Sequence, residues 1–198
     1  MATYKYLYSH ILAALSTLFL STPSGALKLI PTGSRGIYSG MESVTIQGAL
    51  VQVHGQGVLI RGPSGCGKSL TALNLMDRDH LLISDDLVSV AVQADGKLVG
   101  SPLEDQVRIE VRGLGVFRAS ELFQKGTARS AAIDLVVDLD VYDANRDAGM
   151  VEPEIGTFTI LGRNVPQVRL PLVAGVNPAL LIELLAKLLK NVGAVSAE

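Results

Sequence analysis

The stretch Gly62-Pro63-Ser64-Gly65-Cys66-Gly67-Lys68-Ser69 constrains the fold of this chain more than any other feature. It fits the phosphate-loop pattern G-x-x-x-x-G-K-[ST], in which glycines let backbone N–H groups turn onto phosphate oxygens. In such a loop Lys68 reaches the β- and γ-phosphates, and the Ser69 hydroxyl ligates Mg²⁺. The sequence therefore predicts a site for a nucleoside triphosphate and Mg²⁺.

Both flanks of the loop agree with this prediction. Residues 49–53 and 57–60 are β-rich runs divided by the turn 54–56, which predicts a hairpin that leads into the loop. After the loop, leucines at helical spacing predict a helix from Lys68 to about Arg78. A strand, a loop and a helix thus follow one another in the order that the motif requires.

The composition limits the class of protein. A chain of 198 residues that is 48% hydrophobic is long enough for one substantial core and short for two domains. A net charge of −2 with 17 Lys and Arg argues against a broad nucleic-acid-binding face. Cys66 is the only cysteine, so no intrachain disulfide forms, which suits a reducing, cytoplasmic compartment. We interpret its thiol as a spacer in the loop and not as a redox group.

Residues 1–40 differ in composition from the rest of the chain. The apolar run 11–20, followed by small residues, is similar to a secretory signal and is too short to span a bilayer. Export conflicts with ATP binding, so we favour Met41 as the functional start and 1–40 as an uncertain extension. A true signal and a membrane-associated amphipathic arm are the alternatives. The predicted phosphate-loop domain is 41–198.

Two adjacent acids follow the next apolar run. Residues 81–84 predict a buried strand of the parallel type, and Asp85 and Asp86 stand at its carboxyl end, where α/β sheets hold ligands. Alternation along a strand lets one acid face Mg²⁺ and the phosphates while the other takes a different role. An ordinary acidic turn is the alternative. His80, before this strand, we interpret as a surface or packing residue.

The remaining pattern predicts a mixed sheet. Strand hairpins outnumber clear strand-helix-strand units, so the predicted fold class is a single α/β phosphate-loop domain. The expected elements are a hairpin of 88–93 with 97–101, a strand at 109–118 broken by glycines, a strand at 132–139, a loop at 143–156, a hairpin of 157–161 with 165–170, and a helix capped by Asn177 with Pro178 at its first position. The leucines of this last helix are expected to form a broad apolar face in the core.

The spacing from Ser69 to Asp85 and Asp86, followed by Glu110-Val111-Arg112-Gly113-Leu114-Gly115, resembles the catalytic domain of the HPr kinase/phosphorylase family. The resemblance runs from about Thr45 to Asn191. It implies an ATP- and Mg²⁺-dependent kinase that phosphorylates a serine of HPr, the phosphocarrier protein of the bacterial sugar phosphotransferase system. It also implies a homo-oligomer, a hexamer, and a short form without the family's separate N-terminal domain.

The resemblance assigns roles to individual positions. It implies that residues 62–69 bind ATP, with Lys68 on phosphate, and that Ser69 and Glu110 hold Mg²⁺. The pair Asp85 and Asp86 contains the base for the attacking serine hydroxyl, and Asp86 matches the position usually assigned that role. Arg129 also falls where the family has an arginine. It either binds phosphate or caps a surface loop.

The chain departs from the family at three positions. Gln47 stands where the family has a histidine, and Val173 and Val176 replace both arginines of a stretch associated with dephosphorylation. We therefore expect dephosphorylation to be weak, unless Arg146 or Arg169 folds into the site. The leading hypothesis is a kinase of an HPr-like protein. A small-molecule kinase and a nucleotide-sensing module without turnover are the alternatives.

Overall fold

The computed structural model describes residues 42–123, 126–150 and 152–195. Residues 1–40 lie outside these ranges, so the interpretations of that extension stay predictions. In the described part of the chain, no helix is long and apolar enough to cross a membrane.

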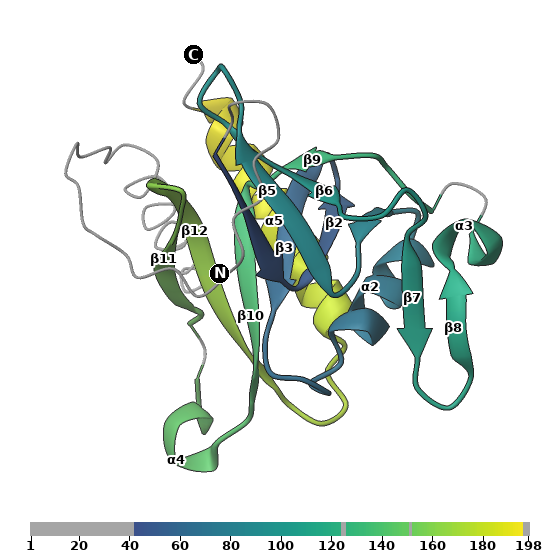
Figure 1. Ribbon diagram of the computed structural model, residues 1–198. Coiled ribbons are helices and arrows are strands. Elements are labelled where there is room, and N and C mark those ends of the chain that lie inside the picture. Colours follow the sequence, from purple (N-terminus) through teal and green to yellow (C-terminus); the bar gives the residue numbers. More distant parts are fainter. Residues whose placement is uncertain (1–41, 124–125, 151, 196–198) are drawn as a thin grey trace.

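A six-stranded sheet forms the centre of the fold (Figure 1). Its strands, in spatial order, are β11 (Glu154–Ile160), β12 (Arg163–Leu172), β10 (Leu135–Val141), β3 (Gln56–Arg61), β2 (Ala49–Val53) and β4 (Leu81–Ser84). β12, β10 and β3 are parallel neighbours, and the other neighbouring pairs are antiparallel. The predicted mixed sheet is confirmed, as are the hairpins β2–β3 and β11–β12.

The predicted parallel setting of β4 is wrong. β4 is an end strand that pairs antiparallel to β2, which is itself antiparallel to β3. Leu82 packs in one core and Ile83 in the other, so both faces of β4 are buried as in a central parallel strand. An apolar run cannot distinguish these two settings. Two reversals nevertheless give β4 the direction of β3, so both strands end at the same edge of the sheet.

A second, four-stranded sheet covers one face of the first. It consists of β1 (Ser43–Gln47), β5 (Leu87–Val92), β6 (Leu98–Pro102) and β9 (Ala131–Ala132), and its β5–β6 hairpin confirms the prediction. Leu50, Leu59 and Val136 point toward this sheet, while Val51, Ile60 and Val137 point toward the helices. The strict alternation of side chains thus separates two apolar cores.

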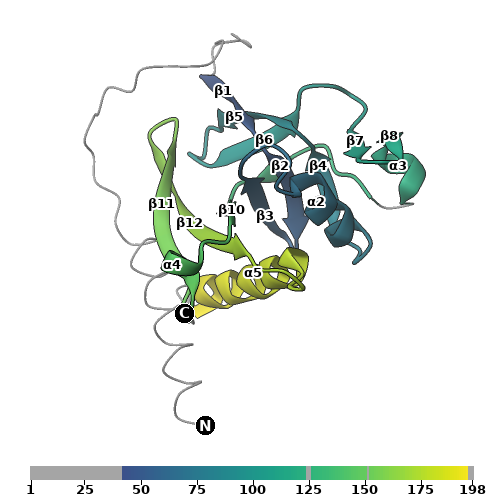
Figure 2. The ribbon, with the colours of Figure 1, turned by 90° about the horizontal axis from the view of Figure 1, so that it is seen from below.

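Two helices cover the other face of the main sheet. Figure 2 shows α2 (Lys68–Met76) and α5 (Pro178–Val195) on this side, opposite β5 and β6. α2 ends two residues before the predicted Arg78. The Asn177 side chain caps α5 as predicted, because its Oδ1 accepts a hydrogen bond of 3.0 Å from the Ala179 N–H.

The predicted apolar face of α5 is only partly core. Ile182 and Leu189 are buried, whereas Leu180 and Leu184 are about half exposed. Residues two apart on a helix are separated by about 200°, so a helix that touches a sheet on one side turns these leucines outward. The expectation that all the leucines pack inside is therefore wrong for Leu180 and Leu184.

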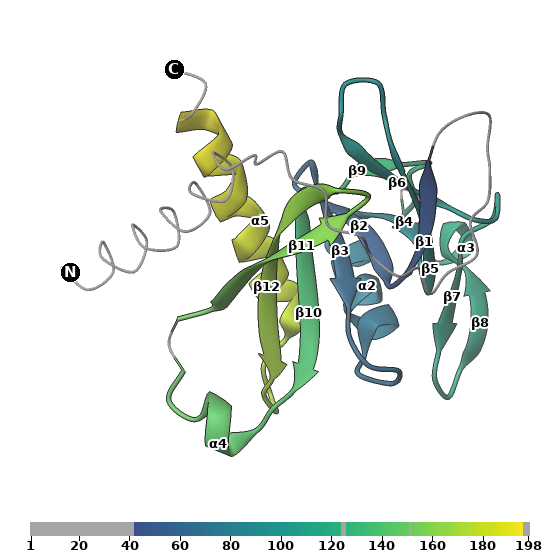
Figure 3. The same cartoon turned by 60° about the vertical axis from the view of Figure 1, so that its left-hand side comes forward.

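Smaller elements complete the described fold. The stretch predicted as a broken strand is a two-stranded hairpin of β7 (Arg108–Val111) and β8 (Gly115–Arg118), followed by α3 (Ala119–Leu122). The predicted loop 143–156 contains the short helix α4 (Ala144–Asp147) and the first residues of β11. Figure 3 shows the β7–β8 hairpin and α4 reaching beyond the two sheets on opposite sides of the molecule.

Candidate active site

The phosphate loop connects β3 to α2 at the carboxyl edge of the parallel strands. Gly62, Gly65 and Gly67 have φ angles of 144°, 79° and 99°, in the region that favours glycine. A Cβ at Gly62 would lie 2.3 Å from the carbonyl oxygen of Leu139, so the loop presses against β10. These three glycines therefore fix a tight turn just before the N-terminus of α2.

Lys68 lies back over its own loop. Its Nζ donates hydrogen bonds of 3.0 Å to the carbonyl oxygens of Gly62 and Pro63. Both acceptors are neutral, so the ammonium charge has no acid as its hydrogen-bond partner at these positions. The charge stays available to an anion at the mouth of the loop.

Asp85 lies next to Ser69, the last residue of the motif. The Ser69 hydroxyl donates a 3.1 Å hydrogen bond to Asp85 Oδ1. Burial raises the pKa of Asp85 above its ordinary value, and the charge of Asp86 adds to this, whereas Ser69, Glu110 and Lys68 act in the opposite direction. Hydroxyl and carboxylate oxygens are ligands that Mg²⁺ prefers. The residues present therefore fit this cation.

Asp86 lines the same cleft but has a different partner. It is exposed, has a φ of 76°, and its Oδ1 accepts a 3.4 Å hydrogen bond from Gln47 Nε2. The Gly48 N–H holds its backbone by donating 2.8 Å to the Asp86 carbonyl. The two adjacent acids thus differ: Asp85 lies on the side of Ser69, and Asp86 is open to a second molecule.

These residues line one cleft with a volume of about 670 Å³. Its walls come from the phosphate loop, the turn between β4 and β5, the segment that joins β6 to β7, and the β7–β8 hairpin. The predicted site residues on the cleft wall are Ser64, Gly65, Gly67, Lys68, Ser69, Asp85, Asp86 and Glu110, together with Gln47. Residues as far apart in the sequence as Gln47 and Val116 thus meet around one space.

The surroundings of the Cys66 thiol fit the interpretation of this residue as a spacer in the loop. Cys66 is half-buried and packs against the helix-side core, and its Sγ lies 2.9 Å from the position that a Gly62 Cβ would take. It is absent from the cleft wall.

Arg112 is a cleft residue to which the sequence analysis gave no role. It lies on the cleft wall, and its Nη2 is 3.6 Å from the position that a Cβ at Gly65 would take. A guanidinium above a phosphate loop suits an anionic ligand, because arginine stays charged and binds phosphate oxygens in pairs. The available signal was its place two residues after Glu110 in the same stretch.

Like Cys66, the predicted loop residues Gly62 and Pro63 are not on the cleft wall, and some predicted residues outside the loop do not join the cleft either. Arg129 is exposed and is not among the residues of the cleft wall, so its role stays a prediction. Val173 and Val176 lie in the exposed turn between β12 and α5, at the same lower edge as the phosphate loop in Figure 1. They too are absent from the cleft wall.

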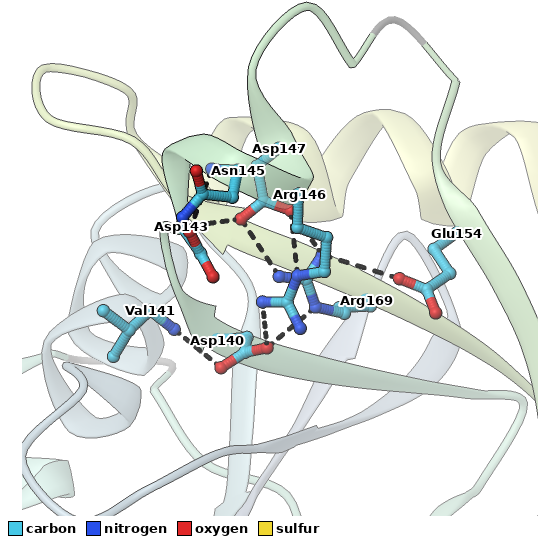
Figure 4. A network of polar contacts seen from close by, with 8 residues as sticks. All are labelled: Asp140, Val141, Asp143, Asn145, Arg146, Asp147, Glu154 and Arg169. Atoms are coloured by element: carbon cyan, nitrogen blue, oxygen red, sulfur yellow. Dashed lines mark hydrogen bonds and ion pairs between the residues drawn. The ribbon is translucent and has the colours of Figure 1, made fainter.

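Arg146 and Arg169 belong to a separate network around α4 (Figure 4). Arg169 pairs with Asp140 at 2.8 Å, with Asp147 at 2.9 Å and with Glu154 at 3.5 Å. Arg146 pairs with the same Asp140 and Asp147, at 2.9 and 3.2 Å. These five contacts with carboxylates leave neither guanidinium free for the cleft.

Comparison with known proteins agrees with the geometry of the cleft. The family described as HPr Serine kinase C-terminal domain matches residues 40–197. HPr kinase/phosphorylase of Exiguobacterium sp. (strain ATCC BAA-1283 / AT1b) is 40% identical over 157 residues, which are 77% of this chain and 50% of that protein. HPr kinase/phosphorylase of Geobacillus sp. (strain WCH70) is 38% identical over 160 residues, 79% of this chain and 51% of that protein.

The fold gives the same result. The solved Hpr(Ser) kinase/phosphatase from Coxiella burnetii aligns with a TM-score of 0.67 and 30% identity, and the alignment covers 77% of this chain and 95% of that one. The chain spans about half the length of the curated relatives it matches. Its family model, its relatives and its phosphate-loop fold agree, and the chain belongs to the HPr serine kinase C-terminal domain family.

Proposed function

We propose that this chain is an ATP- and Mg²⁺-dependent protein-serine kinase that phosphorylates HPr or a related phosphocarrier protein. The observation that carries the proposal is the 3.1 Å contact between Ser69 and Asp85 inside a cleft that also holds Lys68 and Glu110. The names of the relatives support the choice of acceptor.

The cleft residues divide the work of phosphoryl transfer. The N–H groups of the loop and Lys68 bind the phosphates, while Ser69, Asp85 and Glu110 hold the cation. Mg²⁺, when bound, neutralises the charge that develops on the transferred group. The raised pKa of Asp85 fits this role, because a carboxylate with poor solvation gains from a nearby cation.

Asp86 would accept the proton of the serine hydroxyl. It is exposed on the cleft wall, where an acceptor protein can reach it, and Gln47 donates to its Oδ1 and orients it. The hydroxyl oxygen then forms the bond to the γ-phosphorus while the bond to ADP breaks. Arg112, beside Gly65 of the loop, would stabilise the negative charge of the phosphates.

The rim of the cleft favours a protein over a small molecule as acceptor. Leu70, Leu103 and Val116 line the cleft and each exposes more than half of its surface. Exposed apolar side chains grouped around a site are typical of a surface that receives a protein. A small polar acceptor would gain nothing from them.

Transfer of labelled γ-phosphate tests the function. Purified chain, Mg²⁺ and labelled ATP are incubated with the phosphocarrier proteins of the source organism and, separately, with a panel of small hydroxyl compounds. We expect label on a serine of a phosphocarrier. Label on small compounds alone would favour a small-molecule kinase, and tight ATP binding without any transfer would favour a nucleotide-sensing module. Light scattering on the same sample tests the hexamer that the resemblance implies.

We further propose that phosphorylation exceeds dephosphorylation. In the dephosphorylation reaction, inorganic phosphate attacks the phosphorus of phosphoserine and forms pyrophosphate, so the site must hold two phosphate groups close together. Val173 and Val176 cannot do this, and Arg146 and Arg169 are engaged by the carboxylates around α4. Pyrophosphate release from phosphoserine-HPr measures the reaction, and arginine at both valine positions should raise it. Release by the wild-type chain as fast as phosphorylation would contradict the proposal.

A further inference from the structure

A second group of polar residues lies at the edge of the main sheet opposite the phosphate loop. His54 is in the turn between β2 and β3, His80 directly precedes β4, and Glu183 is on α5. One nitrogen of each histidine and one oxygen of Glu183 all lie within 4.8 Å of one another. The two imidazole rings meet edge to face, with centroids 4.7 Å apart. Three distant segments thus bring three metal-binding side chains together.

Glu183 is fixed in one orientation. Its Oε2 accepts hydrogen bonds from Arg78 Nε at 2.8 Å and Nη2 at 2.7 Å, and its Oε1 lies 2.8 Å from His80 Nε2. Hydrogen bonds from Arg78, and then from His80, lower the pKa of this buried carboxyl to about 2. Glu183 is therefore ionised at neutral pH and presents Oε1 toward the histidines.

His54 has no comparable partner. Its Nε2 is buried, and within the described part of the chain it makes no hydrogen bond. Its φ of 52° lies in the left-handed region, which is uncommon for a residue other than glycine. Burial lowers the pKa of His54. The nearby positive groups His80, Lys187 and Lys190 lower this pKa further, whereas Glu183 raises it. The ring is neutral at neutral pH, the form that binds metals.

A buried ring nitrogen without a partner needs an explanation, since nearly all such groups are satisfied in native proteins. We propose that His54, His80 and Glu183 form a binding site for a divalent transition metal, Zn²⁺ by the chemistry of the ligands. Two imidazoles and one carboxylate with an open fourth position are a common zinc ligand set. Nickel and copper also suit imidazole, whereas Mg²⁺ and Ca²⁺ prefer all-oxygen sites.

The geometry needs small adjustments to receive the ion. Bonds of about 2.0–2.1 Å in a tetrahedral site place ligand atoms about 3.3 Å apart. The His80–Glu183 pair at 2.8 Å must open slightly, and the His54 ring must move inward. The proton between His80 Nε2 and Glu183 Oε1 must leave to solvent or to Nδ1 of the same ring, because the ion binds a deprotonated ring nitrogen. Arg78 stays on the other carboxylate oxygen and keeps Glu183 oriented, as outer-shell partners do in metal sites. A surface hollow of about 350 Å³ beside His54 and His80 gives the ion a path from solvent.

Metal binding here would join the β2–β3 turn, β4 and α5. Four residues of β4 separate His80 from Asp85, so the metal site and the cleft acids lie at opposite ends of one short strand. A ligand that binds only the folded chain raises its melting temperature. We therefore expect Zn²⁺ to stabilise the fold independently of any effect on phosphoryl transfer.

The experiment uses untagged, chelator-treated full-length chain in buffer with millimolar Mg²⁺, so that the cleft acids already hold their preferred ion. Calorimetric titration with Zn²⁺ gives stoichiometry and affinity, and Co²⁺ gives visible absorption bands that report a tetrahedral site. We expect one ion per chain, a higher melting temperature with Zn²⁺, and at least about tenfold weaker binding for His54→Gln. This variant leaves the Arg78–Glu183–His80 contacts in place, so it should fold normally by circular dichroism.

Two further variants identify the source of any binding. His10→Gln removes the remaining histidine of the chain, and Cys66→Ser removes its only thiol. Both should bind Zn²⁺ as the wild type does, whereas Glu183→Gln should bind it more weakly. The proposal is overturned if the wild type binds no Zn²⁺ or Co²⁺, if His54→Gln binds as tightly as the wild type, or if Cys66→Ser alone abolishes binding.

Discussion

The phosphate-loop cleft and the α4 network lie at the same carboxyl edge of one sheet and treat charge in opposite ways. In the α4 network, Arg169 and Arg146 meet Asp140 and Asp147 directly, at 2.8 to 3.2 Å. In the cleft, the hydrogen bonds of Lys68 go to backbone carbonyls, and Asp85 accepts from a hydroxyl. Charges that neutralise one another stabilise a fold, whereas charges with neutral partners remain available to a ligand.

The burial of the two regions agrees with this difference. Asp147 is fully buried and Arg169 is only 12% exposed, so their pair needs no further partner. Asp86 and Arg112 are exposed on the cleft wall. Arginine alone is therefore a poor sign of phosphate binding, because the neighbouring carboxylates decide whether its charge is free.

The largest expected effect is that of Lys68→Ala on phosphoryl transfer. Loss of the ammonium removes a contact to the transferred phosphate, so we expect turnover to fall by about 10³-fold or to vanish. No core side chain is lost, and the melting temperature should not change. Lys97→Ala, at the exposed β5–β6 turn, is the matched control and should keep full activity. An unfolded Lys68→Ala protein by circular dichroism would argue against a purely functional lysine.

The second-largest expected effect distinguishes the roles of Asp85 and Asp86. Asp86→Asn keeps size and removes basicity, so ATP should still bind while transfer falls by about 10²-fold or more. Asp85→Asn should instead weaken the binding of Mg²⁺, so that transfer needs a higher Mg²⁺ concentration, because Asp85 lies beside Ser69. Titration of ATP and of Mg²⁺ against each variant measures the split. Full transfer by Asp86→Asn would move the base to Asp85 or to neither acid.

In the α4 network the expected effect is on stability. Arg169→Met leaves the buried Asp147 with Arg146 as its remaining ion-pair partner, and removal of one member of a buried ion pair costs about 3 kcal/mol. Urea unfolding of this variant against Arg163→Met, an exposed arginine at the start of the same strand, gives the difference. Phosphoryl transfer at low temperature should match the wild type. A strong loss of transfer with unchanged stability would place Arg169 in the reaction.

The local parts of this structure could be predicted from the sequence. The phosphate loop, its hairpin, its helix and the Asn177 cap depend on residues within about ten positions of one another. Each uses a rule of spacing or of backbone conformation, such as glycine at positive φ or a side chain that accepts from a helix N–H. Such rules need no knowledge of the rest of the chain.

The features that the sequence did not predict depend on contacts between segments that are distant in the sequence. The antiparallel pairing of β4 with β2 is set by which strand lies next to it, and the apolar residues are the same in either case. Arg169 reaches Asp140 because β12 lies beside β10, with Arg169 opposite Asp138 in the register. Arg112 reaches the phosphate loop because the β7–β8 hairpin folds over it. The pairing of β4 and the contacts of Arg169 have no signature in the spacing of residues, and Arg112 has only its place two residues after Glu110.

The smallest expected effect is that of Asp85→Asn on the free energy of unfolding. Burial raises its pKa in the folded chain, so folding favours the protonated form, and ionised Asp85 destabilises the fold. The stabilising contribution is complete below the pKa of the unfolded chain and is lost as the pH rises through the higher folded-state pKa. We expect Asp85→Asn to be more stable than the wild type at neutral pH, by about 0.5–1 kcal/mol, as for other charges kept for function.

Asp95 gives the matched control with the opposite sign. The Lys97 backbone N–H donates a hydrogen bond to Asp95, which lowers the pKa of Asp95 in the folded chain. Ionised Asp95 therefore stabilises the fold when the pH is above the unfolded-state pKa. This contribution is lost as the pH falls through the lower folded-state pKa. Asp95→Asn should therefore be slightly less stable at neutral pH, whereas Asp85→Asn should be more stable. Urea unfolding of both variants and the wild type across acidic and neutral pH measures both signs. If Asp85→Asn loses stability at neutral pH, its carboxylate is a structural group like those of the α4 network, and the contrast between the two regions fails at that residue.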